Sequence, residues 1–252
     1  MKEHMSRTVV YTAVFGGYEG LIPQPQFGGV DYICFTDSPV RSKCWEVRVV
    51  EPDLDDPTRN ARKYKLLPHN FLSDYEISVW IDANYLVVGD IRKLVGSKLA
   101  DANMGVFDHA QTRSDPRNCV YEEYQSILDM GKRTGNYKDD PDVMSSQIER
   151  YSNERYPPNN GLIFTASLLR RHNEPDVIRT MERWWQEISQ GSRRDQLSLN
   201  YVAWKEDLNY SIIEGDIRNN PWFYMVAHHR KSYATSLIRY KLRKLFGIVK
   251  HR

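Results

Sequence analysis

The sequence is poor in cysteine and in long apolar runs. Its cysteines, Cys34, Cys44 and Cys119, are odd in number and form no CxxC pair. We therefore expect neither a disulfide framework nor a zinc knuckle, and we expect a reducing compartment such as the cytoplasm. No stretch approaches the roughly 20 apolar residues of a membrane-spanning helix. Residues 1–15 also lack the apolar core and small-residue cleavage site of a signal peptide.

Acidic residues are absent from the C-terminal end of the chain. Residues 230–252 hold eight Lys and Arg and no Asp or Glu, and the formal net charge of the whole chain is +2, which leaves −6 for residues 1–229. A nucleic-acid binder is expected to carry its basic surface on the folded domain, so we expect no nucleic-acid partner. We divide the chain into a domain at 1–230 and a basic tail at 231–252.

The basic tail has the pattern of an amphipathic helix. Apolar side chains recur at helical spacing among its Lys and Arg residues, namely Ile238, Leu242, Leu245, Phe246 and Val249. Such a helix is suited to an anionic membrane surface. The alternative is a C-terminal helix that docks on the domain, and the sequence leaves both interpretations open.

Short β-branched and aromatic runs alternate with helical patterns along the rest of the chain. Strands are predicted at 8–15, 31–37, 45–50, 77–82, 85–88, 104–108, 161–166 and 210–214, and helices at 59–67, 117–130, 140–152, 174–190 and 194–206. This order predicts an α/β fold with a mainly parallel, Rossmann-like sheet and helices on both faces. In such sheets ligands bind beyond the carboxyl ends of the strands.

The first two predicted strands end in residues that suit a nucleotide. Gly16 and Gly17 follow the first strand and allow close approach of backbone N–H groups, and Tyr18 can stack on a base. Asp37 follows the second strand and can accept hydrogen bonds from a base or a ribose. An ordinary tight turn and a capping Asp are the structural alternatives.

A cluster of cations precedes the fourth predicted strand. Arg59, Arg62 and Lys63 share one helical face, with Lys65 close behind. Arg and Lys are the usual partners of phosphate groups. A solvated basic face is the alternative, but the position just before a strand that ends in Asp82 favours phosphate binding.

The central motif is Asp82-Ala83-Asn84, directly after a buried strand. Two oxygen-bearing side chains one residue apart can point the same way and hold Mn²⁺ or Mg²⁺ together with a diphosphate. Asn84 supplies a neutral oxygen, so the motif predicts a weaker site than two carboxylates would give. A polar turn after a strand is the alternative.

Three further segments carry polar residues at predicted strand or helix ends. Asn160 and Gly161 precede a strand, and Asp195 and Gln196 open a helix. The last two can bind acceptor hydroxyls or stabilise positive charge at an anomeric carbon, although Asp195 can also interact with the helix dipole. The pair His228 and His229 follows the last strand and can supply a metal or phosphate ligand, or be structural.

Taken together, these motifs resemble those of a glycosyltransferase-like family first described as a domain of unknown function. Its members include plant pollen and seed-mucilage proteins and bacterial polysaccharide-locus proteins. The resemblance covers roughly residues 8–230. The segments that carry it are, in order, VVYTAVFGGYEGL, DYICFTD, ARKYKLLPH, SVWIDANYLVVGDI, NNGLIF and RDQLSLNYVAWK. A more distant likeness is to glycogenin-type and lipopolysaccharide galactosyltransferases.

The resemblance implies a GT-A fold, a nucleoside diphosphate sugar as donor and a divalent cation. Asp82 and Asn84 match the family's metal-binding DxD motif, from which Asn84 departs, and His228 or His229 matches its late metal-binding His. Asp195 and Gln196 match the pair beneath the donor sugar, and the distant likeness implies retention of configuration. The expected donor-binding residues are Thr12, Phe15, Gly16, Tyr18, Asp37, Arg59, Arg62, Lys63, Lys65, Asn160 and Gly161.

The sequence thus favours a hexosyltransferase that acts on a glycan or lipid-linked glycan, in surface polysaccharide synthesis. We expect it in the cytoplasm, peripheral on the inner face of the plasma membrane. One alternative is a non-catalytic nucleotide-sugar or glycan binder on the same fold, which the weakened DxN motif favours. A nucleotidyltransferase is another, but it would be expected to carry an early glycine-rich loop with a Lys, and FGGYEG has none.

Overall fold

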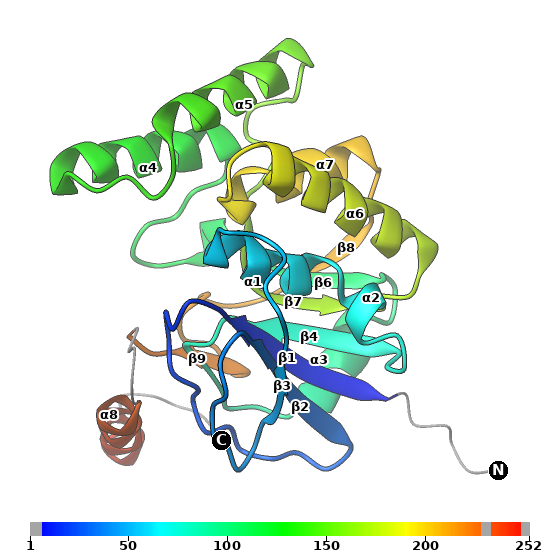
Figure 1. The fold of residues 1–252 in the computed structure, drawn as a ribbon, viewed down its shortest axis with the longest axis vertical. Helices are drawn as coiled ribbons and strands as arrows, with labels where there is room; N and C mark the ends of the chain where they lie inside the picture. Colours follow the sequence, from blue (N-terminus) through cyan, green and yellow to red (C-terminus); the bar gives the residue numbers. More distant parts are fainter. Residues whose placement is uncertain (1–6, 228–232, 248–252) are drawn as a thin grey trace.

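The structure is a computed structural model that describes residues 7–227 and 233–247 (Figure 1). Its strands are β1 (Thr8–Val14), β2 (Val30–Thr36), β3 (Glu46–Val49), β4 (Ile77–Ile81), β5 (Tyr85–Val87), β6 (Met104–Asp108), β7 (Ile163–Arg170), β8 (Tyr210–Ile213) and β9 (Phe223–Met225). Its helices are α1 (Pro57–Leu66), α2 (Pro68–Phe71), α3 (Ile91–Lys98), α4 (Val120–Thr134), α5 (Pro141–Asn153), α6 (Pro175–Gln190), α7 (Leu199–Lys205) and α8 (Ala234–Leu245), with short 3₁₀ helices η1 (His109–Gln111) and η2 (Asp195–Leu197).

Seven strands form one sheet in the order β3-β2-β1-β4-β7-β6-β8. Only β7 runs antiparallel to its neighbours β4 and β6, and the other four pairings are parallel. The carboxyl ends of β1, β2, β4 and β6 therefore share one edge of the sheet with the amino end of β7. We call this the carboxyl edge.

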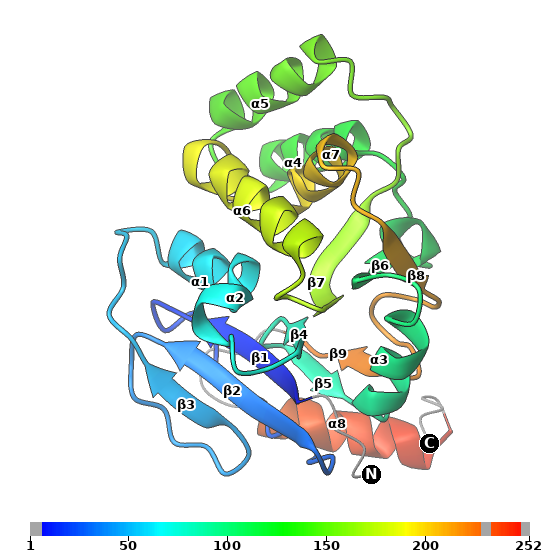
Figure 2. The ribbon, with the colours of Figure 1, turned by 90° about the vertical axis from the view of Figure 1, so that its right-hand side faces the viewer.

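Both faces of the sheet are covered, as its strand pattern predicts. In β1, Val9 and Tyr11 belong to one hydrophobic cluster and Val10 and Val14 to another, because successive side chains point to opposite faces. Figure 2 shows α1, α2, α6 and α7 over one face, and α3 with the two-stranded β5-β9 sheet on the other. The mainly parallel α/β sheet is thus confirmed.

Helices α1 and α3 each begin after an Asp whose side chain caps the helix. Asp56 accepts a hydrogen bond from the backbone N–H of Thr58 (2.8 Å), and Pro57 occupies the first turn of α1. Asp90 caps α3 through the N–H of Arg92 (3.0 Å), although the sequence analysis does not predict this helix. Strand β9 is also absent from the predictions.

Several predicted boundaries differ from the structure, and two of these differences concern segments that hold predicted site residues. Strand β7 begins two residues after the predicted start at Gly161 and extends to Arg170. The predicted helix at 194–206 is a 3₁₀ turn at Asp195–Leu197 followed by α7. The seam between them falls at Ser198, whose N–H donates to the carbonyl oxygen of Asp195 (3.2 Å).

Candidate active site at the carboxyl edge

The loop after β1 combines buried and open residues. Gly16 and Gly17 have φ angles of 67° and 61°, which favour glycine. The ring of Phe15 is buried and stacked on Tyr64 (5.5 Å between centroids), so it belongs to the core. Tyr18 is 60% exposed, and its ring can meet a ligand. Thr12 is fully buried inside β1, where its hydroxyl finds no hydrogen-bond partner among the described residues.

Asp37 joins the loops that follow β1 and β2. Its Oδ2 accepts a hydrogen bond from the N–H of Gly16 (2.7 Å), and its Oδ1 accepts one from the hydroxyl of Ser38 (3.2 Å). The side chain thus holds the glycine loop in place at the carboxyl edge. Asp37 remains half-exposed, so its predicted contact with a base or ribose stays a prediction.

The four cations of α1 do not form a single phosphate-binding cluster in the described structure. Arg59 donates to a carboxylate oxygen of Asp56 (2.8 Å) and to the carbonyl oxygens of Ile188 (3.1 Å) and Gly191 (2.8 Å), which ties α1 to the end of α6. Lys63 pairs with Asp53. The other two cations, Arg62 and Lys65, turn towards Asp195, and their separation from the first two is a correction to the expected arrangement.

Lys65 forms a buried bridge between two carboxylates. Its Nζ lies 2.5 Å from Oδ2 of Asp195 and 3.7 Å from Oδ1 of Asp82, and its side chain is fully buried. The Nε of Arg62 lies 3.2 Å from the same Asp195 oxygen, an ion pair without hydrogen-bond alignment. Charged side chains therefore connect three segments of the chain, which are helix α1, the turn after β4 and η2.

The charges around Asp195 decide its protonation. Burial by itself would raise the pKa of the Asp195 carboxyl, but Arg62 and Lys65 outweigh it and hold that pKa well below its usual range. Burial lowers the pKa of the Lys65 ammonium, and the Asp195 carboxylate opposes this effect. Asp195 is therefore a carboxylate at neutral pH, and its negative charge favours the ammonium form of Lys65.

Asp82 is the carboxylate of this site that is open to solvent. It follows β4 directly, and its side chain is 33% exposed. Trp80, two residues earlier and on the same face of the strand, donates its indole N–H to Oδ1 of Asp82 (2.9 Å). No donor among the described residues occupies Oδ2, which leaves that oxygen for a ligand or cation.

Asn84 turns towards the segment after β9. Its side-chain N–H₂ donates to the backbone carbonyl oxygen of Val226 (3.0 Å), and its backbone carbonyl oxygen accepts from the N–H of Val226 (3.0 Å). Val226 is two residues before His228. His228 and His229 themselves lie outside the described residues, so their predicted role stays a prediction.

A divalent cation fits this donor set only in part within the described residues. They hold no group of three His, Cys, Asp or Glu side chains arranged around a metal position. They do supply the open oxygen of Asp82, and the Val226 contacts bring the chain that leads to His228 beside Asn84. With the amide nitrogen of Asn84 on Val226, its oxygen is the atom that can serve as a ligand.

The segment before β7 lies at the same edge and is held by α7. Asn200 accepts a hydrogen bond from the N–H of Ile163 (2.7 Å) and donates to the carbonyl oxygen of Asn160 (3.3 Å). Gly161 has a φ angle of 77°. Gln196 is buried, and no described residue hydrogen-bonds its side-chain amide.

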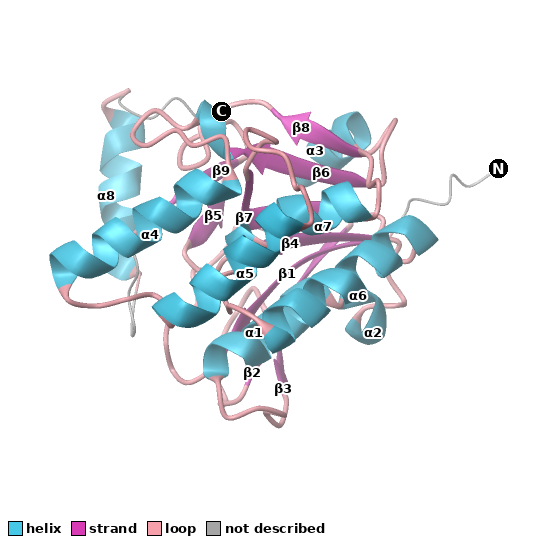
Figure 3. Cartoon of the chain, turned by 90° about the horizontal axis from the view of Figure 1, so that it is seen from above, coloured by secondary structure: helices cyan, strands magenta, loops and turns pink. Residues whose placement is uncertain are grey.

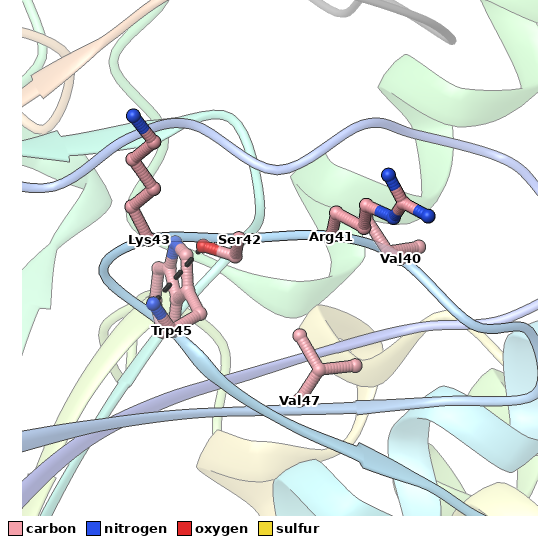
Figure 4. Close-up of a pocket in the computed structure, with 6 residues that line it drawn as sticks. All are labelled: Val40, Arg41, Ser42, Lys43, Trp45 and Val47. Atoms are coloured by element: carbon pink, nitrogen blue, oxygen red, sulfur yellow. Dashed lines mark hydrogen bonds between the residues drawn. The ribbon is translucent and has the colours of Figure 1, made fainter.

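Two residues at the edge carry roles that sequence reasoning missed. Trp80 orients Asp82, and its position two residues before Asp82 on one strand is the signal that could have revealed it. Arg194 lies beside Asp195 and contributes to its low pKa, while its Nη2 reaches Oε1 of Glu123 on α4 (3.8 Å). None of the predicted site residues lines the open pocket of Figure 4, which is formed by Val40, Arg41, Ser42, Lys43, Trp45 and Val47.

The fold is that of the GT-A glycosyltransferases. Among solved structures, the apo structure of the bifunctional glycosyltransferase WbbM superposes with a TM-score of 0.50 at 10% identity, over 85% of this chain and 40% of WbbM. Apo mouse xyloside xylosyltransferase 1 is similar with a TM-score of 0.44 at 9% identity, over 83% of this chain and 85% of that enzyme. Aspergillus fumigatus core-mannan synthase A in its Mn/GDP form gives 0.42 at 8% identity, over 81% and 71%.

The family follows from the sequence. Residues 33–217 match the TOD1/MUCI70 glycosyltransferase-like domain, and the chain belongs to this family. This confirms the resemblance on which the sequence analysis depends. No curated protein sequence matches the chain. The chain spans 40% of WbbM, so nothing of that protein's two activities transfers directly.

Proposed function

We propose that this chain transfers a sugar from a nucleoside diphosphate sugar to a glycan or lipid-linked glycan. The observation that carries the proposal is the open carboxylate of Asp82 at the end of a central strand, backed by the buried bridge from Lys65 to Asp195. In open α/β sheets this edge is where ligands bind. Family membership and the GT-A fold support a glycosyltransferase, and the sugar, the acceptor and a role in surface polysaccharide synthesis are part of the proposal.

The proposed donor site extends from the glycine loop to the Asp82 turn. The backbone of Gly16 and Gly17 and the ring of Tyr18 would receive the nucleotide. Asp82, with Asn84 and His228 or His229, would hold Mn²⁺ or Mg²⁺. When bound, such a cation neutralises negative charge on the diphosphate leaving group. We leave Arg59 and Lys63 out of this donor site because both are engaged elsewhere.

Within η2, we assign Gln196 to the donor sugar and the neighbouring Asp195 to the positioning of cations. Asp195 is only 3% exposed and is paired with two cations, so it is placed to fix Lys65 and Arg62 rather than to move a proton. The neighbouring Gln196 amide would contact sugar hydroxyls. Retention of configuration remains part of the proposal and is read from the anomer of the product.

Besides the DxN motif, the pairing of Asp195 with two cations favours a non-catalytic binder. Such a protein would bind the donor without breaking its glycosidic bond. Hydrolysis of the donor sugar in the presence of Mn²⁺ separates the two functions, because a slow background transfer to water is expected of a glycosyltransferase and not of a binder.

The test begins with a thermal-shift screen of nucleoside diphosphate sugars, with and without Mn²⁺. The stabilising donor is then used in transfer assays with Asp82→Ala. We expect activity to fall at least about 100-fold, because removal of one pre-placed electrostatic group at a reacting centre typically has this effect. Loss of the hydrogen bond from Trp80 costs only about 1 kcal/mol of unfolding free energy, so the fold should remain.

The matched control is Asp74→Ala. Asp74 is exposed and precedes β4, at the opposite end of the strand that ends before Asp82. We expect it to leave transfer unchanged. Equal activity of Asp82→Ala and the wild type would remove the proposed donor site.

We also place the protein in the cytoplasm, at the inner face of the plasma membrane, where lipid-linked acceptors are available. No helix in the described ranges is long and apolar enough to cross a bilayer. We propose that contact with the membrane is made at its surface through helix α8, whose basic amphipathic pattern is one of the two interpretations that the sequence leaves open.

A further inference from the structure

Helix α8 has two apolar faces, and only one of them contacts the rest of the protein. Tyr233, Leu237 and Tyr240 recur at intervals of three and four residues and pack into a small cluster with Ile22 and Val226. Of the two alternatives for the tail, docking on the domain is therefore found in the structure (Figures 1 and 2).

The opposite face of α8 is apolar and exposed to solvent. Ile238, Leu242, Leu245 and Phe246 follow one another at i, i+4, i+7 and i+8 and are exposed by 59%, 48%, 77% and 71%. Leu245 and Phe246 are the two most exposed large apolar side chains in the described part of the chain. A monomeric protein rarely leaves such a row open to water, so this outer face calls for a partner.

Cations flank the outer face on both sides. Helical geometry places Arg239 and Arg243 along one border of it and Lys241 along the other. All three are exposed, and residues 233–247 contain no acidic residue. A surface that is apolar in the middle and basic at both borders is complementary to a bilayer with anionic headgroups over an acyl interior.

A second copy of the chain fits this face less well. Two outer faces packed together would bring like-charged borders against each other, which opposes association. An acidic protein could match the basic borders. The body of this chain, residues 1–229, has a net charge of −6 and is repelled by an anionic surface, so any attraction to such a surface comes from the tail. An anionic membrane satisfies the apolar row and the cations together and accounts for the confinement of positive charge to one end.

We propose that the outer face of α8, formed by Ile238, Leu242, Leu245 and Phe246 with its basic borders, binds the surface of an anionic membrane while the inner face stays docked on the domain. The helix is then a rigid connection and not a loose tether. This deepens the proposed function in one respect, because a lipid-linked acceptor would lie in the same membrane.

The docked face of α8 fixes how the enzyme meets the membrane. Val226, which packs against α8, is hydrogen-bonded to Asn84 in the turn of the proposed donor site. Tyr233 at the start of the helix donates to Glu19 in the loop after β1 (2.9 Å). Membrane contact through the outer face therefore places the carboxyl edge beside the bilayer, at a set orientation to a lipid-linked acceptor.

The test is co-sedimentation of the full chain with vesicles of phosphatidylcholine, with or without phosphatidylglycerol. We expect at least about tenfold stronger binding to the anionic vesicles at low salt, and a loss of this preference as salt rises. The double variant Leu242→Ser/Phe246→Ser should bind the anionic vesicles at least about tenfold more weakly than the wild type. In the wild type, the Leu and Phe side chains move from water into the membrane on binding.

The matched control is Leu54→Ser/Val143→Ser, which removes two exposed apolar side chains from other surfaces. It should bind as the wild type does. All four positions are exposed, so the melting temperature of both double variants should equal that of the wild type, which excludes unfolding as the cause of any loss.

Three results would overturn the inference. One is wild-type protein that binds anionic and neutral vesicles equally weakly. Another is a Leu242→Ser/Phe246→Ser protein that binds anionic vesicles as strongly as the wild type does. The third is a wild-type dimer in sedimentation equilibrium that dissociates in this variant, which would assign the outer face to a second copy. These substitutions leave transfer to a soluble acceptor unchanged, so a failure of the vesicle test leaves the proposed function standing. Unchanged activity in Asp82→Ala, which would remove the proposed donor site, leaves lipid binding standing.

Discussion

Replacing Lys65 by methionine tests the buried charge bridge at the centre of the site. Methionine keeps the length and apolar stem of lysine but removes the ammonium, which lies 2.5 Å from Asp195 in a fully buried position. Breaking a buried ion pair by removing one partner typically costs 3–5 kcal/mol, because it leaves an uncompensated charge. Arg62 still faces Asp195 and is partly exposed, so we expect the lower end, about 3 kcal/mol. For a chain of this size, that lowers the melting temperature by about 6–12 °C.

The penalty should shrink as the pH is lowered. In the wild type the pKa of Asp195 is held below its unfolded value of about 3.9, so its charged form stabilises the folded state above that pH and the contribution is lost in stronger acid. Without Lys65, less positive charge opposes the effect of burial, so the pKa of Asp195 rises above its wild-type value. The carboxyl of the variant then takes up a proton at a higher pH than in the wild type, which relieves the buried charge.

The assay is urea unfolding followed by tryptophan fluorescence at pH 7 and at lower pH, combined with a double-mutant cycle. Asp195→Asn in the Lys65→Met background removes the stranded charge, so the double variant should be more stable than the sum of the single changes predicts, by about 1–3 kcal/mol. Lys63→Met is the matched control on the same helix, since Lys63 pairs with the exposed Asp53 and should matter by less than about 1 kcal/mol. A Lys65→Met penalty equal to that of Lys63→Met, or strict additivity in the cycle, would refute the bridge.

Two further predictions concern the frame of the site. A Cβ at Gly89 would lie 2.4 Å from the carbonyl oxygen of Pro221, so Gly89→Ala should cost about 1–3 kcal/mol in urea unfolding, whereas Gly96→Ala, in α3 with nothing within 4 Å, should stabilise by about 0.5–1 kcal/mol. Equal effects at the two glycines would contradict the close approach. Arg170 is fully buried, hydrogen-bonded to Tyr11 and paired with no carboxylate of the described residues, so Arg170→Met should leave the unfolding free energy unchanged or raise it by about 1–4 kcal/mol. A loss of more than about 2 kcal/mol would show that the guanidinium stabilises the core.

The sequence predicts the sheet well because its strands are short, apolar and bounded by turn residues. The strand at Met104–Asp108 is found at its predicted bounds, and β1 and β4 end within one residue of theirs. Strand β9 has only three residues and follows Asn and Pro, so it carries no period to detect. Helix α3 did carry a signal, the capping Asp90, but its eight residues are too few for a clear helical pattern.

The positions of candidate site residues could be predicted at the ends of strands, whereas the partners of the side chains on the helices could not. Asp82 and Gly16 lie at the carboxyl edge because parallel topology requires it. On α1, helical spacing groups Arg59 with Lys63, but the structure gives these side chains separate partners. Spacing fixes only the angle between side chains around a helix, and what each one meets depends on which segments pack nearby.

The tail shows the same division. Its spacing of apolar residues predicted an amphipathic helix and left open whether it docks or meets a membrane. The tertiary structure adds a second apolar face, built around Tyr233 and Tyr240, which the sequence analysis did not count. Docking and exposure are therefore compatible, on opposite sides of one helix.

By itself, the sequence determined the α/β class, the family and the residues that end each strand, because periodicity and turn chemistry act over a few neighbouring positions. Only the tertiary structure decided that Lys65 joins Asp195, 130 positions later in the chain, and leaves Asp82 open. The reason is physical. Burying a charge without a partner is costly, and the partner of Lys65 is supplied by whichever distant segment the folded core brings to it.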